Sequence, residues 1–221
     1  MMETKQEYVI GDCLEVMQRY PDNHFDLILT DPPYGINICN CGTVGGEKLA
    51  KVTNYNNQTW DKERLDKIYF DEMLRVSKNQ IIFGGNYYTD YVPPTPCFII
   101  WDKDNSGNFA DCELAWTSFK TAVRLFKYRW NGMLQGDMKN KEERVHPTQK
   151  PVPLFKWILN KYSKPYDKIL DPFCGSGTIL EACMNLDLDC LAIDISDEWV
   201  PHYIKRLKLN NAKLTDNWSK P

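Results

Sequence analysis

The chain contains seven short runs of apolar residues. Most of them are continuous rather than alternating with polar residues, which is typical of strands buried on both faces. The pattern therefore predicts a sheet that is covered on both sides. The runs are EYVIGD, FDLILTD, QIIFGG, CFIIWDK, AVRLFKY, DKILDPF and DCLAIDI, at residues 7–12, 25–31, 80–85, 97–103, 122–128, 167–173 and 189–195.

Between these runs lie segments whose apolar residues recur with the period of an α-helix. Strands that alternate with amphipathic helices favour an α/β fold, in which a mostly parallel, twisted sheet carries helices on both faces. We therefore predict a doubly wound, Rossmann-like sheet. The predicted helices cover residues 65–76, 152–162, 179–186 and 200–207.

The length of the chain favours one domain. Its 221 residues suffice for one sizeable α/β core and leave little room for a second. We therefore expect a single domain over residues 1–221. Residues 36–60, rich in Gly and Asn, and residues 128–146 have no clear period. A loop as long as 36–60 in a compact domain is typically functional, so we expect a lid there.

Composition indicates an ordinary globular protein, with 43% hydrophobic and 26% charged residues. No apolar run approaches the roughly 20 residues that cross a bilayer, and no secretory signal is evident, so we expect a cytoplasmic protein with free thiols and no membrane partner. Cys39 and Cys41 leave a zinc site as an alternative. Their spacing is shorter than in structural zinc sites and no second ligand pair follows, so we expect no metal.

Four of the apolar runs end at or next to an aspartate: Asp12, Asp31, Asp171 and Asp194. In open α/β sheets, ligands bind beyond the carboxyl ends of the strands. Any single aspartate at such a place can instead be a helix N-cap. Because there are four, we expect a shared crevice lined by acids.

The segment DPFCGSGT, residues 171–178, has the composition of a cofactor loop. Gly175 and Gly177 permit a tight turn and close approach to a ligand, and the helix that follows presents free N–H groups. The loop lacks the Lys of a P-loop and the third glycine of the dinucleotide fingerprint, which disfavours ATP and NAD. Asp194 follows where an acid accepts hydrogen bonds from ribose hydroxyls. An adenosine cofactor without a pyrophosphate fits this pattern.

Together with DPPY at residues 31–34, this loop resembles a motif of the S-adenosylmethionine-dependent amino-methyltransferases of DNA. HPTQKP at 146–151 and GDCLEVM at 11–17 resemble further cofactor motifs of that family. The order, with the catalytic motif first and the cofactor loop about 140 residues later, is similar to that of the circularly permuted beta class. The resemblance implies a class I methyltransferase fold with permuted motif order.

The resemblance implies S-adenosylmethionine as the cofactor. His146 can also be a plain loop histidine, and nothing requires it as a base. The expected cofactor-binding residues are Asp12, Cys13, His146, Thr148, Lys150, Asp171, Phe173, Gly175, Ser176, Gly177, Thr178 and Asp194.

DPPY then has a catalytic interpretation. An adenine N6 amine is a poor nucleophile because its lone pair is delocalised into the ring. The resemblance implies that Asp31 accepts one N–H of the amine and the Pro32 carbonyl the other, with Pro32 and Pro33 fixing the backbone. Tyr34 offers a ring on which a flipped base can stack. A plain DPP turn with a buried tyrosine is the structural alternative.

Several functional alternatives stay open. In this family DPPY accompanies adenine N6 and SPPY cytosine N4, so we expect an adenine methyltransferase, with cytosine N4 as the alternative. RNA offers the same base edge. The related glutamine methyltransferases of proteins generally carry NPPY. A catalytically inactive cofactor-binding or DNA-binding relative is a further alternative.

The charge distribution indicates where DNA would bind. The chain has a net charge of −3, yet residues 120–150 hold eight basic and three acidic residues. A solvated surface face is the ordinary explanation of such a cluster. As a DNA-recognition insertion, segment 120–146 would use Lys127, Arg129 and Arg144 on the backbone phosphates of double-stranded DNA. A homodimer and a cognate restriction endonuclease are partners that this interpretation admits.

Overall fold

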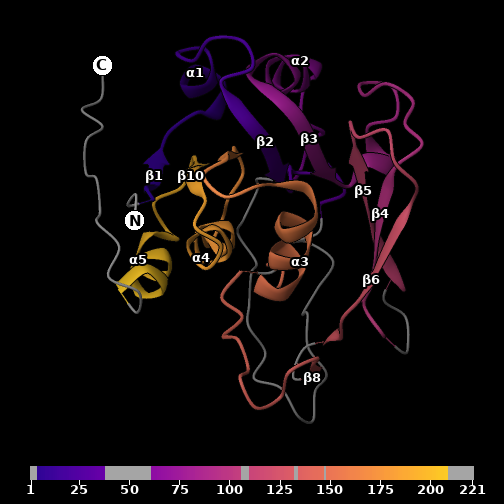
Figure 1. The fold of residues 1–221 in the computed structure, drawn as a ribbon, viewed down its shortest axis with the longest axis vertical. Helices are drawn as coiled ribbons and strands as arrows, with labels where there is room; N and C mark the ends of the chain where they lie inside the picture. Colours follow the sequence, from indigo (N-terminus) through magenta and orange to yellow (C-terminus); the bar gives the residue numbers. More distant parts are fainter. Residues whose placement is uncertain (1–3, 38–60, 106–109, 132–133, 147, 209–221) are drawn as a thin grey trace.

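The computed structural model describes residues 4–37, 61–105, 110–131, 134–146 and 148–208, which form one large sheet with flanking helices (Figure 1). The strands are β1 (Gln6–Ile10), β2 (Phe25–Thr30), β3 (Ser77–Phe83), β4 (Phe98–Asp102), β5 (Cys112–Thr117), β6 (Arg124–Lys127), β7 (Trp130–Asn131), β8 (Leu134–Gln135), β9 (Lys168–Asp171) and β10 (Asp189–Asp194). The helices are α1 (Cys13–Met17), α2 (Lys67–Val76), η2 (Gly85–Tyr87), α3 (Val152–Tyr162), α4 (Thr178–Met184) and α5 (Val200–Lys208).

The large sheet has the strand order β1-β10-β9-β2-β3-β5-β4-β6. Strands β1, β10, β9, β2 and β3 are mutually parallel, whereas β5 runs antiparallel to both β3 and β4. The central neighbours β9 and β2 are far apart in sequence, and β1, the first strand of the chain, lies at an edge. This is the mostly parallel sheet with permuted order that the sequence predicts.

Helices cover both faces of the sheet, as predicted. Figure 1 shows α1 and α2 on one side and α3, α4 and α5 on the other. Two separate apolar clusters correspond to these layers, one around Ile28, Phe70 and Met73 and the other around Leu27 and Ile158. Ile28 and Leu27 are neighbours on β2 whose side chains alternate between faces, so this strand is buried on both sides.

All seven predicted strands and all four predicted helices are present, with ends that differ by a few residues. The prediction missed β5, the antiparallel pair β7–β8 inside the segment 128–146, α1 and the short η2. In β5, CELAWT has an apolar run of only three residues next to a glutamate, and α1 is only five residues long, too short to display a helical period. None of the helices in the described ranges has the length and apolar character needed to span a bilayer.

The strand directions bring the predicted acids to one edge of the sheet. Asp171 and Asp194 are the last residues of β9 and β10, Asp31 follows β2 directly, and Asp12 follows β1 after one glycine. These four strands are parallel neighbours in the order β1-β10-β9-β2, so their carboxyl ends share the edge at which ligands of open α/β sheets bind.

Candidate active site

Hydrogen bonds with Tyr88 and Asp61 hold the backbone of the tetrapeptide 31–34 in place. The hydroxyl of buried Tyr88 donates a hydrogen bond to the Pro33 carbonyl. The Asp61 carboxylate oxygen Oδ1 accepts the backbone N–H of Tyr34 at 2.7 Å and of Gly35 at 2.8 Å. Asp61, only 3% exposed, thus fixes the backbone at the end of DPPY. Sequence reasoning missed it because it stands at the end of an aperiodic loop.

Gly35 is required by this geometry. Its φ of +73° lies in the left-handed region, and a Cβ added there would stand 2.4 Å from the Arg64 backbone nitrogen. Asn37 N–H donates to the Asp61 carbonyl at 2.7 Å. This hydrogen bond brings Asn37 and Asp61 together beside DPPY. The rest of the predicted lid, residues 38–60, and both cysteines of the zinc alternative lie outside the described residues.

Asp31 is largely buried and engaged on both oxygens. The Tyr34 hydroxyl donates to its Oδ1, and the Lys150 ammonium pairs with its Oδ2. Burial raises the pKa of Asp31, the Lys150 charge opposes this rise, and the Glu113 charge adds to it. The carboxylate keeps further lone pairs, so it can still accept a hydrogen bond from a substrate.

Lys150 is held by a second carboxylate that sequence reasoning did not single out. Its Nζ lies 3.0 Å from Glu113 Oε2, and the other Glu113 oxygen pairs with the Lys103 ammonium. Burial by itself raises the pKa of Glu113, but the Lys150 and Lys103 charges outweigh it and lower that pKa to about 2. The Lys150 ammonium, which we expected at the cofactor, therefore faces carboxylates.

The glycine loop follows β9 as predicted. Gly175 and Gly177 have φ values of +49° and +72°, which other residues rarely adopt, and Gly177 precedes α4 directly. A Cβ at Gly177 would lie 2.8 Å from the Cβ of Tyr203 on α5. Gly175 N–H donates to Asp194 Oδ2 at 2.8 Å, so the acid that ends β10 orients the loop.

Asp171 joins the glycine loop to the end of β2. Its Oδ1 accepts the Thr30 hydroxyl at 2.6 Å and the Phe173 N–H at 3.1 Å. Burial, with a smaller contribution from the Asp31 and Asp194 charges, raises the pKa of Asp171 to about 7, although the two hydrogen bonds favour the ionised form. Near neutral pH this buried carboxyl is therefore close to its point of half-protonation.

His146 is a neutral group in this site. Its imidazole lies edge-on to Trp199 with ring centroids 4.5 Å apart, and Thr148 N–H donates to His146 Nδ1 at 3.3 Å. Burial, together with the charges of Lys150 and Arg144, lowers the pKa of His146 to about 3. The histidine is thus uncharged at neutral pH, in keeping with the absence of any need for it as a base.

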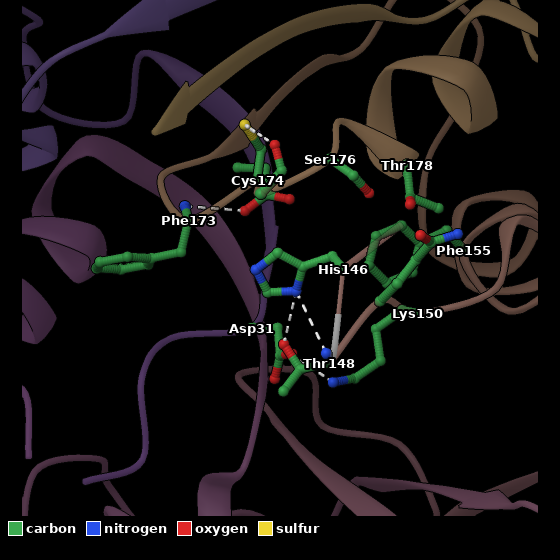
Figure 2. Close-up of a pocket in the computed structure, with 12 residues that line it drawn as sticks. Asp31, His146, Thr148, Lys150, Phe155, Phe173, Cys174, Ser176 and Thr178 are labelled. Atoms are coloured by element: carbon green, nitrogen blue, oxygen red, sulfur yellow. Dashed lines mark hydrogen bonds and ion pairs between the residues drawn. The ribbon is translucent and has the colours of Figure 1, made fainter. Parts of the chain in front are cut away.

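One pocket brings the two motifs together. Figure 2 shows Asp31 and Lys150 on one side of the His146 ring and Ser176 and Thr178 on the other. Eight of the expected cofactor-binding residues, and Asp31 of the expected catalytic motif, line this pocket. The lining consists of Asp31, His146, Thr148, Gln149, Lys150, Phe155, Asp171, Phe173, Cys174, Gly175, Ser176 and Thr178.

Other predicted residues lie beside this pocket rather than in its lining. Asp12 caps α1, with its Oδ1 accepting the Leu14 N–H at 2.8 Å, so the N-cap alternative is realised for this acid. Cys13 is buried in the cluster beneath α1 and α2. Asp194 accepts the Gly175 and Ser196 N–H groups.

An exposed apolar surface adjoins Asp194, and sequence reasoning did not assign it. Ile195 is 75% exposed and Ile10 is 47% exposed, and Ile10 is paired with Asp194 in the β1–β10 register. Exposed isoleucines beside a hydrogen-bonding carboxylate match the two parts of an adenosine, an apolar ring and a ribose. The position of Ile195 directly after the acid of β10 was the available signal.

The basic segment is more neutral than its composition suggests. Lys127 Nζ lies 2.8 Å from Asp104 Oδ1, and Arg129 Nη2 lies 2.5 Å from Asp104 Oδ2. Lys127 and Arg129 are nevertheless exposed, whereas Arg144 is half-buried. Because β6 is parallel to β4, the Lys127 end of β6 lies at the same edge of the sheet as the pocket.

Comparison with known proteins adds independent findings. A family model described as DNA methylase matches residues 101–205, which include the glycine loop. The type II methyltransferase M2.MboI of Moraxella bovis is 25% identical over 224 residues, 83% of this chain and 81% of its own. The solved structure of PvuII DNA methyltransferase (cytosine-N4-specific) has a TM-score of 0.63 at 14% identity and covers 99% of this chain and 89% of its own. The M1.HpyAVI–SAM complex has a TM-score of 0.56 at 22% identity, with coverages of 91% and 98%.

The chain thus has the fold of the class I methyltransferases, an α/β fold with a mostly parallel sheet. Together, the DNA methylase model, the type II methyltransferase relative and the solved structures support an S-adenosylmethionine-dependent amino-methyltransferase with S-adenosylmethionine as its cofactor.

The buried Asp171 predicts a pH dependence of stability. The unfolded chain ionises this carboxyl near its ordinary value of 3.8 and the folded protein only near 7, so the folded state holds an extra proton between these values. Asp171 therefore makes the protein less stable as pH rises from about 4 to 7. Asp171→Asn lacks this titration. The free energy of unfolding of the variant, relative to that of the wild type, should therefore rise from pH 5 to pH 8, by up to about 1.4 kcal/mol per pH unit.

Urea unfolding of the cofactor-free proteins at several pH values measures this difference, with Asp22→Asn as the matched control because Asp22 is 71% exposed. A difference between Asp171→Asn and the wild type that stays constant from pH 5 to pH 8 would contradict the prediction.

Proposed function

We propose that the chain transfers a methyl group from S-adenosylmethionine to the exocyclic N6 of an adenine that has been flipped out of duplex DNA. The proposal is supported most directly by two acceptors at one place, the Asp31 carboxylate and the Pro32 carbonyl beside it. Among the described residues, no hydrogen-bond donor to the Pro32 carbonyl is found.

The residues around the pocket fit the cofactor. Gly175 and Gly177 leave room for close approach, the Asp194 carboxylate can accept from ribose hydroxyls, and Ile195 offers an apolar surface to the adenine. When bound, S-adenosylmethionine supplies a methyl group made electrophilic by its cationic sulfonium. His146, being neutral, adds no positive charge that would oppose this cation.

Asp31 and Pro32 then act on the amine of the base. Two acceptors on the two N–H groups pull electron density toward the nitrogen and orient its lone pair, which restores nucleophilicity without prior loss of a proton. This role requires Asp31 as an anion. Lys150 supports the anionic form, and the Tyr88 bond to Pro33 and the Asp61 bonds to Tyr34 and Gly35 hold the motif in position.

Tyr34 supports the base-flipping part of the proposal. Its ring stacks on Tyr87 with centroids 4.8 Å apart and an interplanar angle of 19°. A base inside a duplex is out of reach, and an aromatic ring beside the acceptors gives an extruded base a stacking partner. Tyr34 remains half-buried, so a base would extend an aromatic stack that is already built.

Cytosine N4 is the second candidate substrate. Its exocyclic amine presents the same two N–H groups to Asp31 and Pro32, and the PvuII structure of similar fold is cytosine-N4-specific by name. The adenine proposal rests on the aspartate of DPPY. A catalytically inactive relative is disfavoured because Asp31, Pro32, Pro33 and Tyr34 are all present.

Transfer of labelled methyl groups to DNA tests this function. We expect the protein to label unmodified DNA, and mass spectrometry of the digested DNA to find N6-methyladenine. Asp31→Ala should lower transfer by at least about a hundredfold while cofactor affinity stays within a few-fold, because the lost acceptor acts on the amine.

Asp71→Ala serves as the control, since Asp71 is an exposed aspartate on α2 whose side chain is 56% accessible. N4-methylcytosine as the product would assign the second candidate. Cofactor binding without transfer to any DNA would contradict methylation altogether.

Lys127 and Arg129 are proposed to contact DNA phosphates. Their exposure and their place at the pocket edge of the sheet support this role, and Asp104 holds both side chains together. A homodimer or a cognate restriction endonuclease would extend the recognition surface. Both remain proposals, as does a single domain over residues 1–221.

We predict that Lys127→Ala and Arg129→Ala weaken DNA binding and reduce its salt dependence, while cofactor affinity is unchanged. A gel-shift titration at several salt concentrations measures both effects. Lys78→Ala is the matched control, because Lys78 is equally exposed and paired with Asp26 at 2.6 Å, but lies near the start of β3 and so at the opposite edge of the sheet. Equal affinities for the Lys127, Arg129 and Lys78 variants would remove the assignment.

A further inference from the structure

Four charged side chains form a continuous chain behind the catalytic motif. Lys103, just after β4, pairs with Glu113 on β5. Glu113 Oε2 lies 3.0 Å from Nζ of Lys150, which stands just before α3. Lys150 in turn pairs with Asp31. Two anions and two cations alternate, so the cluster is neutral as a whole. Glu113 is the link between the two lysines.

Lys150 is the most deeply buried of the four, with a side chain only 5% exposed. A buried ammonium is costly unless carboxylates compensate it and hold its donors. The side chain of lysine is a flexible stem, so one partner alone does not fix its position. Glu113 supplies the second carboxylate contact, and the Phe83 ring, whose centroid lies 5.2 Å from Nζ, supplies a further favourable surface.

Lys103 differs from Lys150 in what it can do when Glu113 is lost. Its side chain is 19% exposed, and it lies at the outer end of the chain of charges. Without Glu113, Lys103 can turn to solvent, whereas Lys150 would retain Asp31 as its one described carboxylate partner. The loss of Glu113 therefore acts on the catalytic motif through Lys150.

We propose that Glu113 is a positioning residue, which holds the Lys150 ammonium against Asp31 and thereby keeps the catalytic carboxylate ionised and correctly placed. The inference rests on the proposed function in that Asp31 is taken as the acceptor for the substrate amine. Glu113 belongs to none of the motifs that the sequence displays, and it reaches the site only because β5 lies beside β3 in the folded sheet.

Glu113 affects Asp31 in two opposite ways, and this makes the proposal testable. As a nearby negative charge, Glu113 raises the pKa of Asp31 directly. As the anchor of Lys150, it lowers that pKa by keeping a cation in contact. If Glu113 acts as a charge alone, removing it shifts the titration of Asp31 to lower pH. If it positions Lys150, removing it shifts the titration to higher pH.

The experiment is a pH titration of the Asp31 carboxyl by ¹³C NMR in the whole protein, with the signal assigned by its loss in Asp31→Asn. We expect Glu113→Ala to move the midpoint to higher pH by about one unit or more, since a cation in contact shifts a carboxyl by that order. Glu113→Gln, which keeps an oxygen acceptor for Lys150, should show a smaller upward shift. A downward shift or no shift in Glu113→Ala would overturn the proposal.

Glu72→Gln is the matched control, because Glu72 is also a partly buried glutamate paired with a cation, Arg75, at 2.5 Å, but lies on α2. It should leave the Asp31 titration unchanged. The titration requires no methyl transfer, so it tests the positioning role even if the wild type proves inactive and the proposed function fails.

In the active protein, kcat for methyl transfer should fall about tenfold to a hundredfold in Glu113→Ala, with KM for cofactor and DNA nearly unchanged. The acidic limb of the kcat profile should move to higher pH, together with the NMR midpoint. An unchanged kcat profile would contradict the positioning role.

Discussion

A single buried hydrogen bond, from the Thr30 hydroxyl to Asp171 Oδ1 at 2.6 Å, joins the two halves of the site. Thr30 ends the strand that leads into the catalytic motif, and Asp171 opens the glycine loop 141 positions later. Parallel pairing of β2 with β9 places the ends of both strands at one edge. Whatever binds behind the glycines therefore lies beside Asp31, and the rest of the site depends on this adjacency.

This arrangement brings several carboxyl groups close together, and the negative charge of each is compensated in a different way. Asp31 has an ammonium partner in Lys150, Asp194 accepts backbone N–H groups, and Asp171 shifts its pKa upward toward neutrality. His146 stays uncharged, so it adds no positive charge that would oppose a cationic cofactor. In the proposed function, the same group of carboxylates lies beside both the cationic sulfonium and the substrate amine.

The sequence was informative where function demands a local pattern. DPPY, the paired glycines and each strand-end acid are recognisable from the residues next to them in the sequence. The alternation of apolar runs with helical periods predicted the doubly wound sheet. Glu113 and Asp61 could not be found in this way. Each acts across a strand or loop on a residue distant in sequence, and neither stands in a periodic segment. The positive charge of residues 120–150 is partly offset by Asp104, which pairs with Lys127 and Arg129 but lies outside that segment.

The most direct measurement is a crystal structure of the protein with S-adenosylmethionine and a duplex that contains its target base. The account predicts that the methyl carbon faces the exocyclic nitrogen, and that the Asp31 carboxylate and the Pro32 carbonyl each accept one hydrogen bond from that nitrogen. A cofactor whose methyl group points away from Asp31, beyond reach of the flipped base, would contradict it.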